Sequence, residues 1–148
     1  CELVAASDIV IASDRSRFGQ PEIKLGVFPP VASILLPLVI GEKRAREMVL
    51  TGELLTAEQA YAAGLVNHLV PENAIEGKCE ELLNAFRQMS VPGLEIARRA
   101  MLQTSGMGFD EALKRSEEIY LNELMSFKDP HEGVEAFIAK RQPRWKHK

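Results

Sequence analysis

The sequence predicts an α/β fold in which short strands occur only in the first half and helices fill the second half. Two short runs rich in β-branched residues, at 8–13 and 65–70, are typical of buried strands. From Pro92 onward, apolar residues recur at helical spacing. The chain has 148 residues, of which 46% are hydrophobic and 26% charged, and this suits one ordinary globular domain.

The first elements alternate between helix, strand and turn. Residues 1–6 suit the end of a helix, and the strand at 8–13 follows. A polar turn at 14–17 precedes a second extended piece that begins at Arg17. Pro21 disfavours a helix just before it, because the residue preceding a proline is pushed out of the α region. We therefore expect Glu22 on a loop or at a strand edge.

The middle of the chain turns helical after a rigid break at Pro29-Pro30. A helix is expected from Val31 and an amphipathic helix at 42–50. Thr56 and Gln59 have the spacing of a capping box, which predicts that a further helix starts there. Later helices are expected at about 72–89, 92–104, 110–126 and 130–140.

Charge and cysteine content exclude several classes of protein. The net charge of −3 argues against a nucleic-acid binder, which needs a basic surface. Cys1 and Cys79 provide neither a disulfide framework nor a metal cluster, and the histidines share no metal-ligand spacing, so we expect no metal and a reducing, cytoplasmic location. No apolar run is long enough for a membrane span, so no membrane partner is expected. Because the chain starts at Cys1 within an amphipathic segment, we expect it to be a piece of a longer protein.

Three stretches carry a family resemblance. They read C-E-L-x-x-A-x-D-I-x-I-A-S from Cys1, F-G-Q-P-E-I-x-L-G-x-x-P from Phe18, and L-T-G-E-L-L-T-A-E-Q-A-Y-A-A-G-L-V-N-H-L-V from Leu50. In this order and spacing they resemble the enoyl-CoA hydratase/isomerase (crotonase) superfamily. The resemblance runs from Cys1 to about Arg144, which is nearly the whole chain.

The resemblance implies an α/β fold of the ClpP/crotonase type. Residues 1–72 would form the second half of a spiral core of ββα units, and residues 73–148 a helical region for CoA contacts and for assembly into a homotrimer or hexamer. The family's two catalytic glutamates fall on Glu2 and Glu22. Its oxyanion-hole N–H groups would lie upstream of Cys1, in a missing N-terminal half of the same protein.

The chemistry of hydration explains why the resemblance implies two acids. Water must lose a proton on one side of the double bond while a proton reaches carbon on the other. We assign Glu2 as the base and Glu22 as the acid, with coupled protonation states because they share one water. Spacing alone would make Glu2 a solvated residue and Glu22 a surface acid. Coenzyme A is part of the acyl-CoA substrate, and no other cofactor is expected.

One departure from the family pattern bears on the substrate. After Gly26, where many members have P-G-x-G-G, this chain has V-F-P-P-V-A-S, which stiffens a turn bordering the acyl pocket. Pro29, Pro30 and Val31 are therefore expected to contact substrate. The segment resembles the cyclohexa-1,5-diene-1-carbonyl-CoA hydratases of anaerobic aromatic degradation. The alternatives are a straight-chain enoyl-CoA hydratase, an enoyl-CoA isomerase, and a catalytically incomplete assembly module.

The basic C-terminus has two interpretations. Residues 140–148 are either a solvated tail or a contact to the CoA phosphates, and the resemblance assigns the CoA contact to Lys140. A Ser-His-Asp hydrolase is disfavoured, because the chain has no G-x-S-x-G nucleophile elbow.

Overall fold

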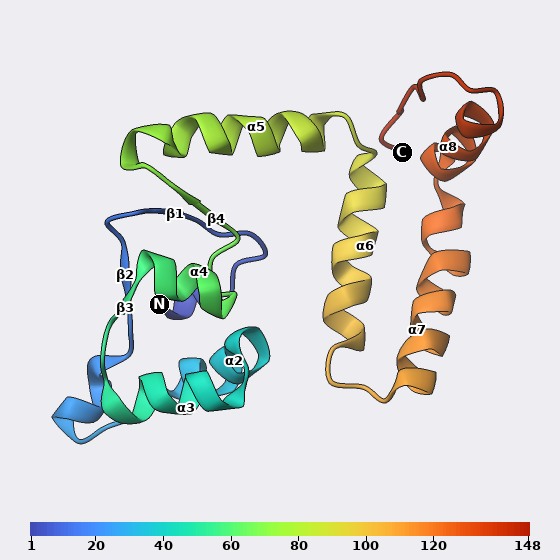
Figure 1. Ribbon diagram of the computed structural model, residues 1–148. Helices are drawn as coiled ribbons and strands as arrows, with labels where there is room; N and C mark the ends of the chain where they lie inside the picture. The colour runs from blue at the N-terminus through green and yellow to red at the C-terminus, as the bar shows by residue number, and fades with distance from the viewer. The chain divides into compact units, whose positions relative to one another are not determined.

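The computed structural model describes residues 1–148 and divides into two compact units, residues 1–82 and 83–148. Figure 1 shows the strands in the first unit and the long helices of the second. The boundary falls within α5 (Ile75–Arg87). The division of roles that we expected after residue 72 stays a prediction.

The first unit combines short strands with helices. Its helical elements are α1 (Glu2–Ala5), η1 (Pro21–Leu25), α2 (Pro30–Ile40), α3 (Glu42–Thr51), α4 (Ala57–Ala63), η2 (Glu72–Ala74) and the start of α5, where η marks a 3-10 helix. Its strands are β1 (Ile11–Ser13), β2 (Arg17–Phe18), β3 (Leu55–Thr56) and β4 (His68–Val70).

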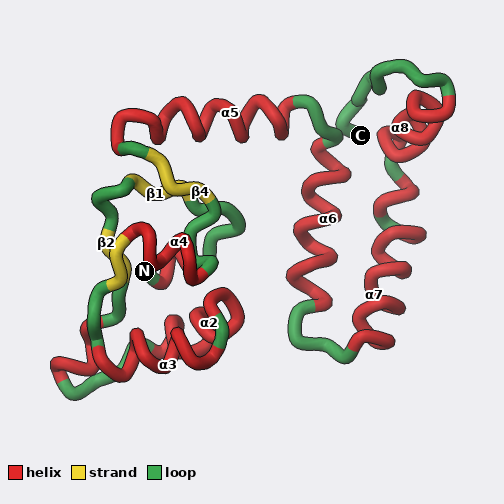
Figure 2. Tube along the Cα trace, in the orientation of Figure 1, coloured by secondary structure: helices red, strands yellow, loops and turns green.

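The strands of the first unit form two separate pairs, drawn in yellow in Figure 2. β1 lies parallel to β4, with Ala12 opposite Leu69. β2 lies antiparallel to β3, with Phe18 opposite Leu55. Parallel strands need a long crossover connection, and the segment carrying α2, α3 and α4 supplies it.

Local sequence rules explain where the helices of this unit begin and end. Pro30 is the first residue of α2, a position at which its missing N–H costs nothing. The capping box predicted at the start of α4 is confirmed, since Gln59 N donates to Thr56 Oγ1 over 3.2 Å and Thr56 N to Gln59 Oε1 over 2.8 Å. Helices α3 and α4 end at Gly52 and Gly64, which both adopt the left-handed conformation.

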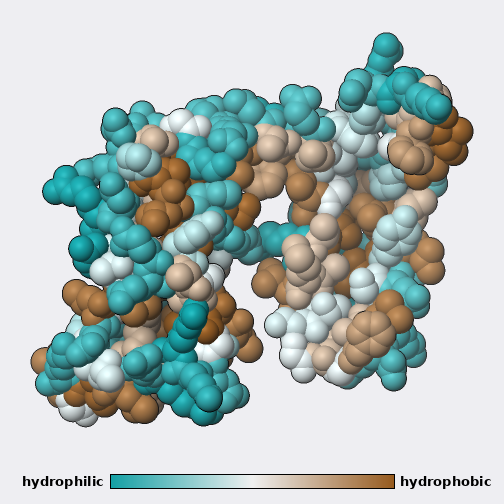
Figure 3. All heavy atoms as spheres, viewed as in Figure 1, coloured by the Kyte–Doolittle hydropathy of each residue, from teal (hydrophilic) through white to brown (hydrophobic).

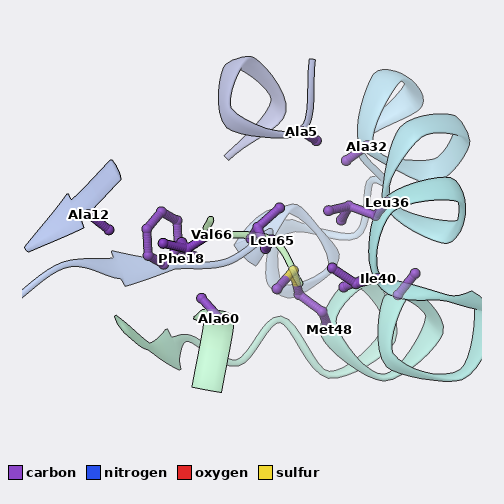
Figure 4. Packing of buried hydrophobic residues seen from close by; sticks show 11 residues of the cluster. Ala5, Ala12, Phe18, Ala32, Leu36, Ile40, Met48, Ala60, Leu65 and Val66 are labelled. Atoms are coloured by element: carbon purple, nitrogen blue, oxygen red, sulfur yellow. The ribbon is translucent and has the colours of Figure 1, made fainter. Parts of the chain in front are cut away.

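One apolar cluster fills the first unit. Ala32, Leu36 and Ile40 recur at every fourth position of α2 and are buried. Figure 4 shows this side of α2 facing Leu65 and Met48. This packing holds α2 in place, and α2 in turn contacts α1.

The second unit is helical throughout. α6 (Val91–Thr104) and α7 (Phe109–Asn122) form an antiparallel hairpin, visible in Figure 1. The 3-10 turn η3 (Leu124–Ser126) leads to α8 (Lys128–Ile138). Ile119 of α7 is fully buried within this unit.

Two predicted strands are shorter in the structure than expected, and one strand was missed. The strands predicted at 8–13 and 65–70 keep only their last three residues each. In the second case the N–H of Leu65 donates to the carbonyl of Ala60 and closes the end of α4 before the strand begins. The missed strand, β3, has only two residues and is defined by its pairing with β2.

In the second unit, two predicted helices differ from the observed ones by two residues or more at an end. The helix expected at 110–126 ends at Asn122, and η3 follows it. The helix expected at 130–140 starts and ends two residues earlier. Pro130 therefore stands at its third position, where an N–H would have no acceptor within the helix.

Large apolar side chains are exposed on both units, and Figure 3 shows apolar atoms, in brown, among the polar ones. Leu25 and Leu38 are examples in the first unit, and Phe109 and Phe137 in the second. None of the helices has both the length and the apolar character needed to cross a bilayer.

Candidate active site

Glu2 lies in the first turn of α1, and its carboxylate reaches a second helix. Its Oε1 accepts a hydrogen bond from the backbone N–H of Ala32 over 3.1 Å. Ala32 is the third residue of α2, and the first N–H groups of a helix have no acceptor within that helix. A carboxylate there also interacts favourably with the positive end of the helix dipole. The start of α2 therefore orients the half-buried Glu2.

A cavity of about 320 Å³ adjoins this contact. Its lining residues are Ala32, Ser33, Pro37, Ala45, Arg46, Val49 and Leu50, from α2 and α3. The lining is mostly apolar with a few polar groups, as is typical of small-molecule sites. Because Ala32 both lines the cavity and donates to Glu2, the cavity adjoins the residue that orients the predicted base.

Glu22 lies on the 3-10 helix η1, so the expected loop or strand edge was wrong. The steric restriction from Pro21 acts on the residue before it, and a proline is well placed at the start of a helix. Gly26, in the left-handed conformation, ends η1, and its N–H donates to the carbonyls of Glu22 and Ile23. The side chain of Glu22 is half-buried.

The carboxylate of Glu22 is held by Gln20. The side chain of Gln20 is buried, with only 2% of the residue exposed. The nitrogen and oxygen of a glutamine amide are assigned from the hydrogen-bond network, and the satisfied orientation places Nε2 of Gln20 3.1 Å from both carboxylate oxygens of Glu22. In this orientation the amide nitrogen is a hydrogen-bond donor to the carboxylate.

The structure places both predicted acids in the first unit, each with its own donor. Glu2 is bonded to Ala32, and Glu22 to Gln20. The carboxylates themselves do not bond to each other. Their convergence on one water molecule, and their catalytic roles, stay predictions.

The residues expected to contact substrate begin α2. Pro29 is buried and caps the helix, Pro30 is its exposed first residue, and Val31 follows, also exposed. The carbonyl of Pro29 accepts hydrogen bonds from both the N–H and the Oγ of Ser33, over 3.0 and 2.7 Å. The two prolines restrict the backbone torsions of this segment. Its contact with substrate stays a prediction.

Lys140 lies beyond the end of α8 in the second unit. It is exposed and adopts a left-handed backbone conformation with φ of 50°. Most side chains of the tail that follows are exposed, while its backbone and Trp145 form hydrogen bonds within the same unit. Trp145 Nε1 donates to the carbonyl of Gln88 over 2.7 Å, and Lys128 N to the carbonyl of Lys148 over 2.9 Å.

A fully buried carboxylate fixes the end of this tail. Asp129 accepts hydrogen bonds from Ser90 Oγ and Lys146 N, each over 2.7 Å, and from His147 N. Burial pushes the pKa of Asp129 upward, but the hydrogen bonds from Lys146, Ser90 and His147 outweigh it, so the pKa is lowered from its ordinary value.

A second carboxylate, Glu132, holds the start of the tail. Arg141 donates to both of its oxygens over 2.6 and 3.1 Å, and Arg144 N donates to Oε1 over 2.7 Å. The hydrogen bonds from Arg141 and Arg144 lower the pKa of Glu132 to about 2.

Sequence reasoning missed Gln20 and Asp129. Gln20 precedes Glu22 by two residues in the Gln-Pro-Glu motif, and its nearness to the acid was the available signal. Asp129 gave no such signal, because its partners lie 17 to 39 residues away in the chain.

Comparisons with known proteins agree on one family. The model of the family described as enoyl-CoA hydratase/isomerase matches residues 1–148. A 2,3-dehydroadipyl-CoA hydratase of Escherichia coli is 34% identical over 147 residues, which cover 99% of this chain and 57% of that protein. The mitochondrial enoyl-CoA hydratase domain-containing protein 3 of Xenopus laevis is 33% identical over 147 residues, 99% of this chain and 50% of that protein. The chain thus spans about half the length of the curated relatives it matches.

Solved structures agree with the sequence relatives. An enoyl-CoA hydratase structure from Geobacillus kaustophilus matches with a TM-score of 0.93 and 29% identity over 99% of this chain and 57% of that one. An enoyl-CoA hydratase/isomerase structure from Mycobacterium abscessus matches with a TM-score of 0.90 and 30% identity over 100% of this chain and 61% of that one. These likenesses confirm the predicted crotonase-like α/β fold. With the family model matched from the first residue to the last, the chain belongs to the enoyl-CoA hydratase/isomerase family.

Proposed function

We propose that this protein hydrates a conjugated enoyl-CoA thioester, with Glu2 as the base and Glu22 as the acid. The observation that carries the proposal is that both acids are oriented by hydrogen-bond donors in one unit of a chain that belongs to this family. A proton-transferring side chain must be held within reach of its proton, and such orientation supports that role.

The proposed reaction adds one water molecule across the double bond next to the thioester. Glu2 takes a proton from water, and the oxygen of that water bonds to the β-carbon. Electrons of the double bond move toward the thioester carbonyl, and Glu22 delivers a proton to the α-carbon. Ala32 N donates to Oε1 of Glu2, so Oε2 is the oxygen we assign to water. The negative charge on the carbonyl oxygen needs N–H donors.

We favour cyclohexa-1,5-diene-1-carbonyl-CoA as substrate over a straight-chain enoyl-CoA. The Val27-to-Val31 segment supports this choice, because its two prolines give a stiff wall suited to a ring. Other acyl groups are alternatives, since one relative is named a 2,3-dehydroadipyl-CoA hydratase. Measuring kcat/KM for the cyclic dienoyl-CoA, crotonyl-CoA and 2,3-dehydroadipyl-CoA in parallel decides among them, and a highest value for crotonyl-CoA would reject the cyclic substrate.

The product identifies the reaction class. The full-length protein is incubated in D2O with each thioester, and the product is examined by NMR. Hydration places one deuterium on the α-carbon and a hydroxyl on the β-carbon. A product with a shifted double bond and no hydroxyl would identify the alternative, an enoyl-CoA isomerase, and reject hydration.

The proposal includes the protein's partners. Lys140 contacts the CoA portion of the substrate, and no cofactor beyond that CoA takes part. The exposed Phe109 and Phe137 of the helical unit support a homotrimer or hexamer, because large exposed apolar side chains are typical of protein interfaces. Light scattering on the eluted protein measures the assembly, and a monomer at micromolar concentration would contradict it. The free Cys1 and Cys79 fit the cytoplasmic location that we propose.

A catalytically incomplete assembly module is the second candidate, and the same exposed apolar residues favour it. It predicts an assembled protein that hydrates none of the three thioesters. Measured hydration by the assembled protein would reject this candidate.

A further inference from the structure

We propose that a cavity lined by α4, β4 and α5 binds a small organic carboxylate. Its volume of about 390 Å³ is within the range that small-molecule sites use. The three elements follow one another along the chain, as Figure 1 shows, and the cavity lies within the first unit. Its lining residues are Tyr61, Asn67, His68, Leu69, Val70 and Lys78. None of them has a role in the proposed hydration, so this inference goes beyond the proposed function.

Lys78 gives the lining a positive charge. Its side chain is only 21% exposed, although a lysine is rarely withdrawn from water unless it has a partner. Nζ of Lys78 donates to Oε1 of Glu81 over 2.7 Å. An ammonium group has three donors, so two remain for a ligand. With His68 neutral at pH 7, Lys78 is the one formally charged residue of the lining, and the cavity therefore favours an anion.

The other polar residues of the lining add neutral hydrogen-bond donors. Oδ1 of Asn67 accepts from the backbone N–H of Val10 over 2.8 Å, which leaves the amide nitrogen of Asn67 to donate elsewhere. Tyr61 contributes a hydroxyl and His68 a ring N–H. A carboxylate has two oxygens with about four acceptor positions between them, so it can use several of these donors at once.

The apolar part of the lining selects among anions. Leu69 and Val70 offer no side-chain donor, and they suit the hydrocarbon body of a ligand. A phosphate group has more charge than the single Lys78 can balance and no apolar surface. The lining therefore fits a carboxylate on an apolar body better than it fits a phosphate.

A carboxylate of the protein itself already occupies the edge of this site. The pKa of Glu81 is lowered, chiefly by the hydrogen bond from Lys78 and its charge, and also by His68. Two residues of the lining thus act on one carboxylate. Glu81 lies three positions after Lys78 in α5, and its side chain is 66% exposed, so the pair is weak. A carboxylate ligand can replace Glu81 on Lys78, and Glu81 then turns to water.

The first test compares benzoate with benzamide, which has nearly the same shape and no charge. Saturation-transfer NMR on the full-length protein is expected to give a Kd on the order of 1 mM for benzoate, as suits so small a ligand. Benzamide should bind at least about 10-fold more weakly, because it forms no charge-assisted hydrogen bond with Lys78. Equal affinities would overturn the inference. Inorganic phosphate that displaces benzoate at concentrations below the Kd of benzoate would overturn the choice of a carboxylate.

Substitutions locate the binding in this cavity. Lys78→Met should weaken benzoate binding by more than about 10-fold, and Tyr61→Phe by about 2- to 10-fold. Glu81→Gln should tighten it about 2- to 5-fold, because the competing carboxylate is gone. Lys43→Met, at an exposed position in α3, is the matched control and should leave the Kd unchanged.

The competition with Glu81 gives the sharpest outcome. Weaker benzoate binding by Glu81→Gln, or an unchanged Kd for Lys78→Met, would overturn the inference. Tyr61→Phe and Glu81→Gln alter exposed side chains, so both remain informative if Lys78→Met does not fold.

The outcomes also separate this inference from the proposed function. Lys78→Met should leave kcat for hydration unchanged. If benzoate binds as expected and the protein hydrates no thioester, the proposed function fails and this inference stands. If hydration proceeds and benzoate binds no more tightly than benzamide, the inference fails and the proposed function stands.

Discussion

Glu2 Oε1 accepts the backbone N–H of Ala32, which joins α1 to the first turn of α2 across 30 positions of sequence. The same bond satisfies an N–H that the helix itself leaves without an acceptor. One oxygen of Glu2 therefore has a structural partner. Substitutions of Glu2 can separate this structural hydrogen bond from the proposed role of Glu2 as the base.

Glu2→Gln and Glu2→Ala are expected to differ in stability. Glutamine keeps an oxygen that can accept from Ala32 N, so its free energy of unfolding should stay within about 0.5 kcal/mol of the wild type. Alanine leaves the N–H without that partner and should cost about 1 kcal/mol or more, as the loss of a helix cap does. Denaturant unfolding measures both values. Equal losses for the two variants would show that the hydrogen bond contributes nothing.

Gly52 is expected to control the position of η1, which carries Glu22. It has φ of +63°, and a Cβ there would lie 3.0 Å from Cγ2 of Ile23 and 3.1 Å from Cε of Lys24, both on η1. Gly52→Ala should therefore destabilise the protein by more than about 1 kcal/mol and lower kcat.

Gly77→Ala is the matched control, because Gly77 lies in α5 with open space around its Cβ position. It should stabilise the protein by about 0.5–1 kcal/mol with kcat unchanged. A Gly52→Ala protein as stable and active as the wild type would show that η1 accommodates a side chain at this point.

Asp129 is expected to be essential to the second unit. Asp129→Asn places an amide where the carboxylate accepts from Ser90, Lys146 and His147, so at least one N–H or hydroxyl loses its acceptor. The expected loss is about 2–4 kcal/mol in the free energy of unfolding. Asp110→Asn, at an exposed position in the first turn of α7, should cost less than about 1 kcal/mol. Similar losses in thermal unfolding of both variants would contradict this role.

The tail should give the protein a distinct response to acid through Glu132. Its pKa is lowered from 4.5 to about 2 in the folded state. A lowered folded pKa means stability that is present above pH 4.5 and is lost as the pH falls toward about 2. The melting temperature of the wild type should therefore fall between these pH values more steeply than that of Glu132→Gln. Parallel curves for the two proteins would show that the pairing with Arg141 adds no stability.

Local signals in the sequence predicted much of the fold, and distant pairings explain what they missed. The capping box of Thr56 and Gln59 needs only neighbours along the chain, and it was predicted residue by residue. Strand β3 has two residues and depends on its pairing with Phe18, 37 positions away from Leu55, so no local pattern reveals it.

In the candidate site, the two acids were predicted from the sequence but their hydrogen-bond donors were not. The motifs around Glu2 and Glu22 predicted which residues to examine, because those motifs are contiguous in sequence. The donors that hold them were not predicted. Ala32 donates through its backbone, which leaves no mark on residue type, and Gln20 acts through a side-chain orientation that only the folded contact defines.

The central claim is that the carboxylates of Glu2 and Glu22 both catalyse the proposed hydration. The most direct measurement is kcat for hydration by Glu2→Gln, Glu22→Gln and the control Glu76→Gln, an exposed acid of α5, in the protein as its gene encodes it. We predict a fall of about 10²–10⁴-fold for each of the first two and no change for the control. Near-normal kcat in either Glu2→Gln or Glu22→Gln would contradict the claim.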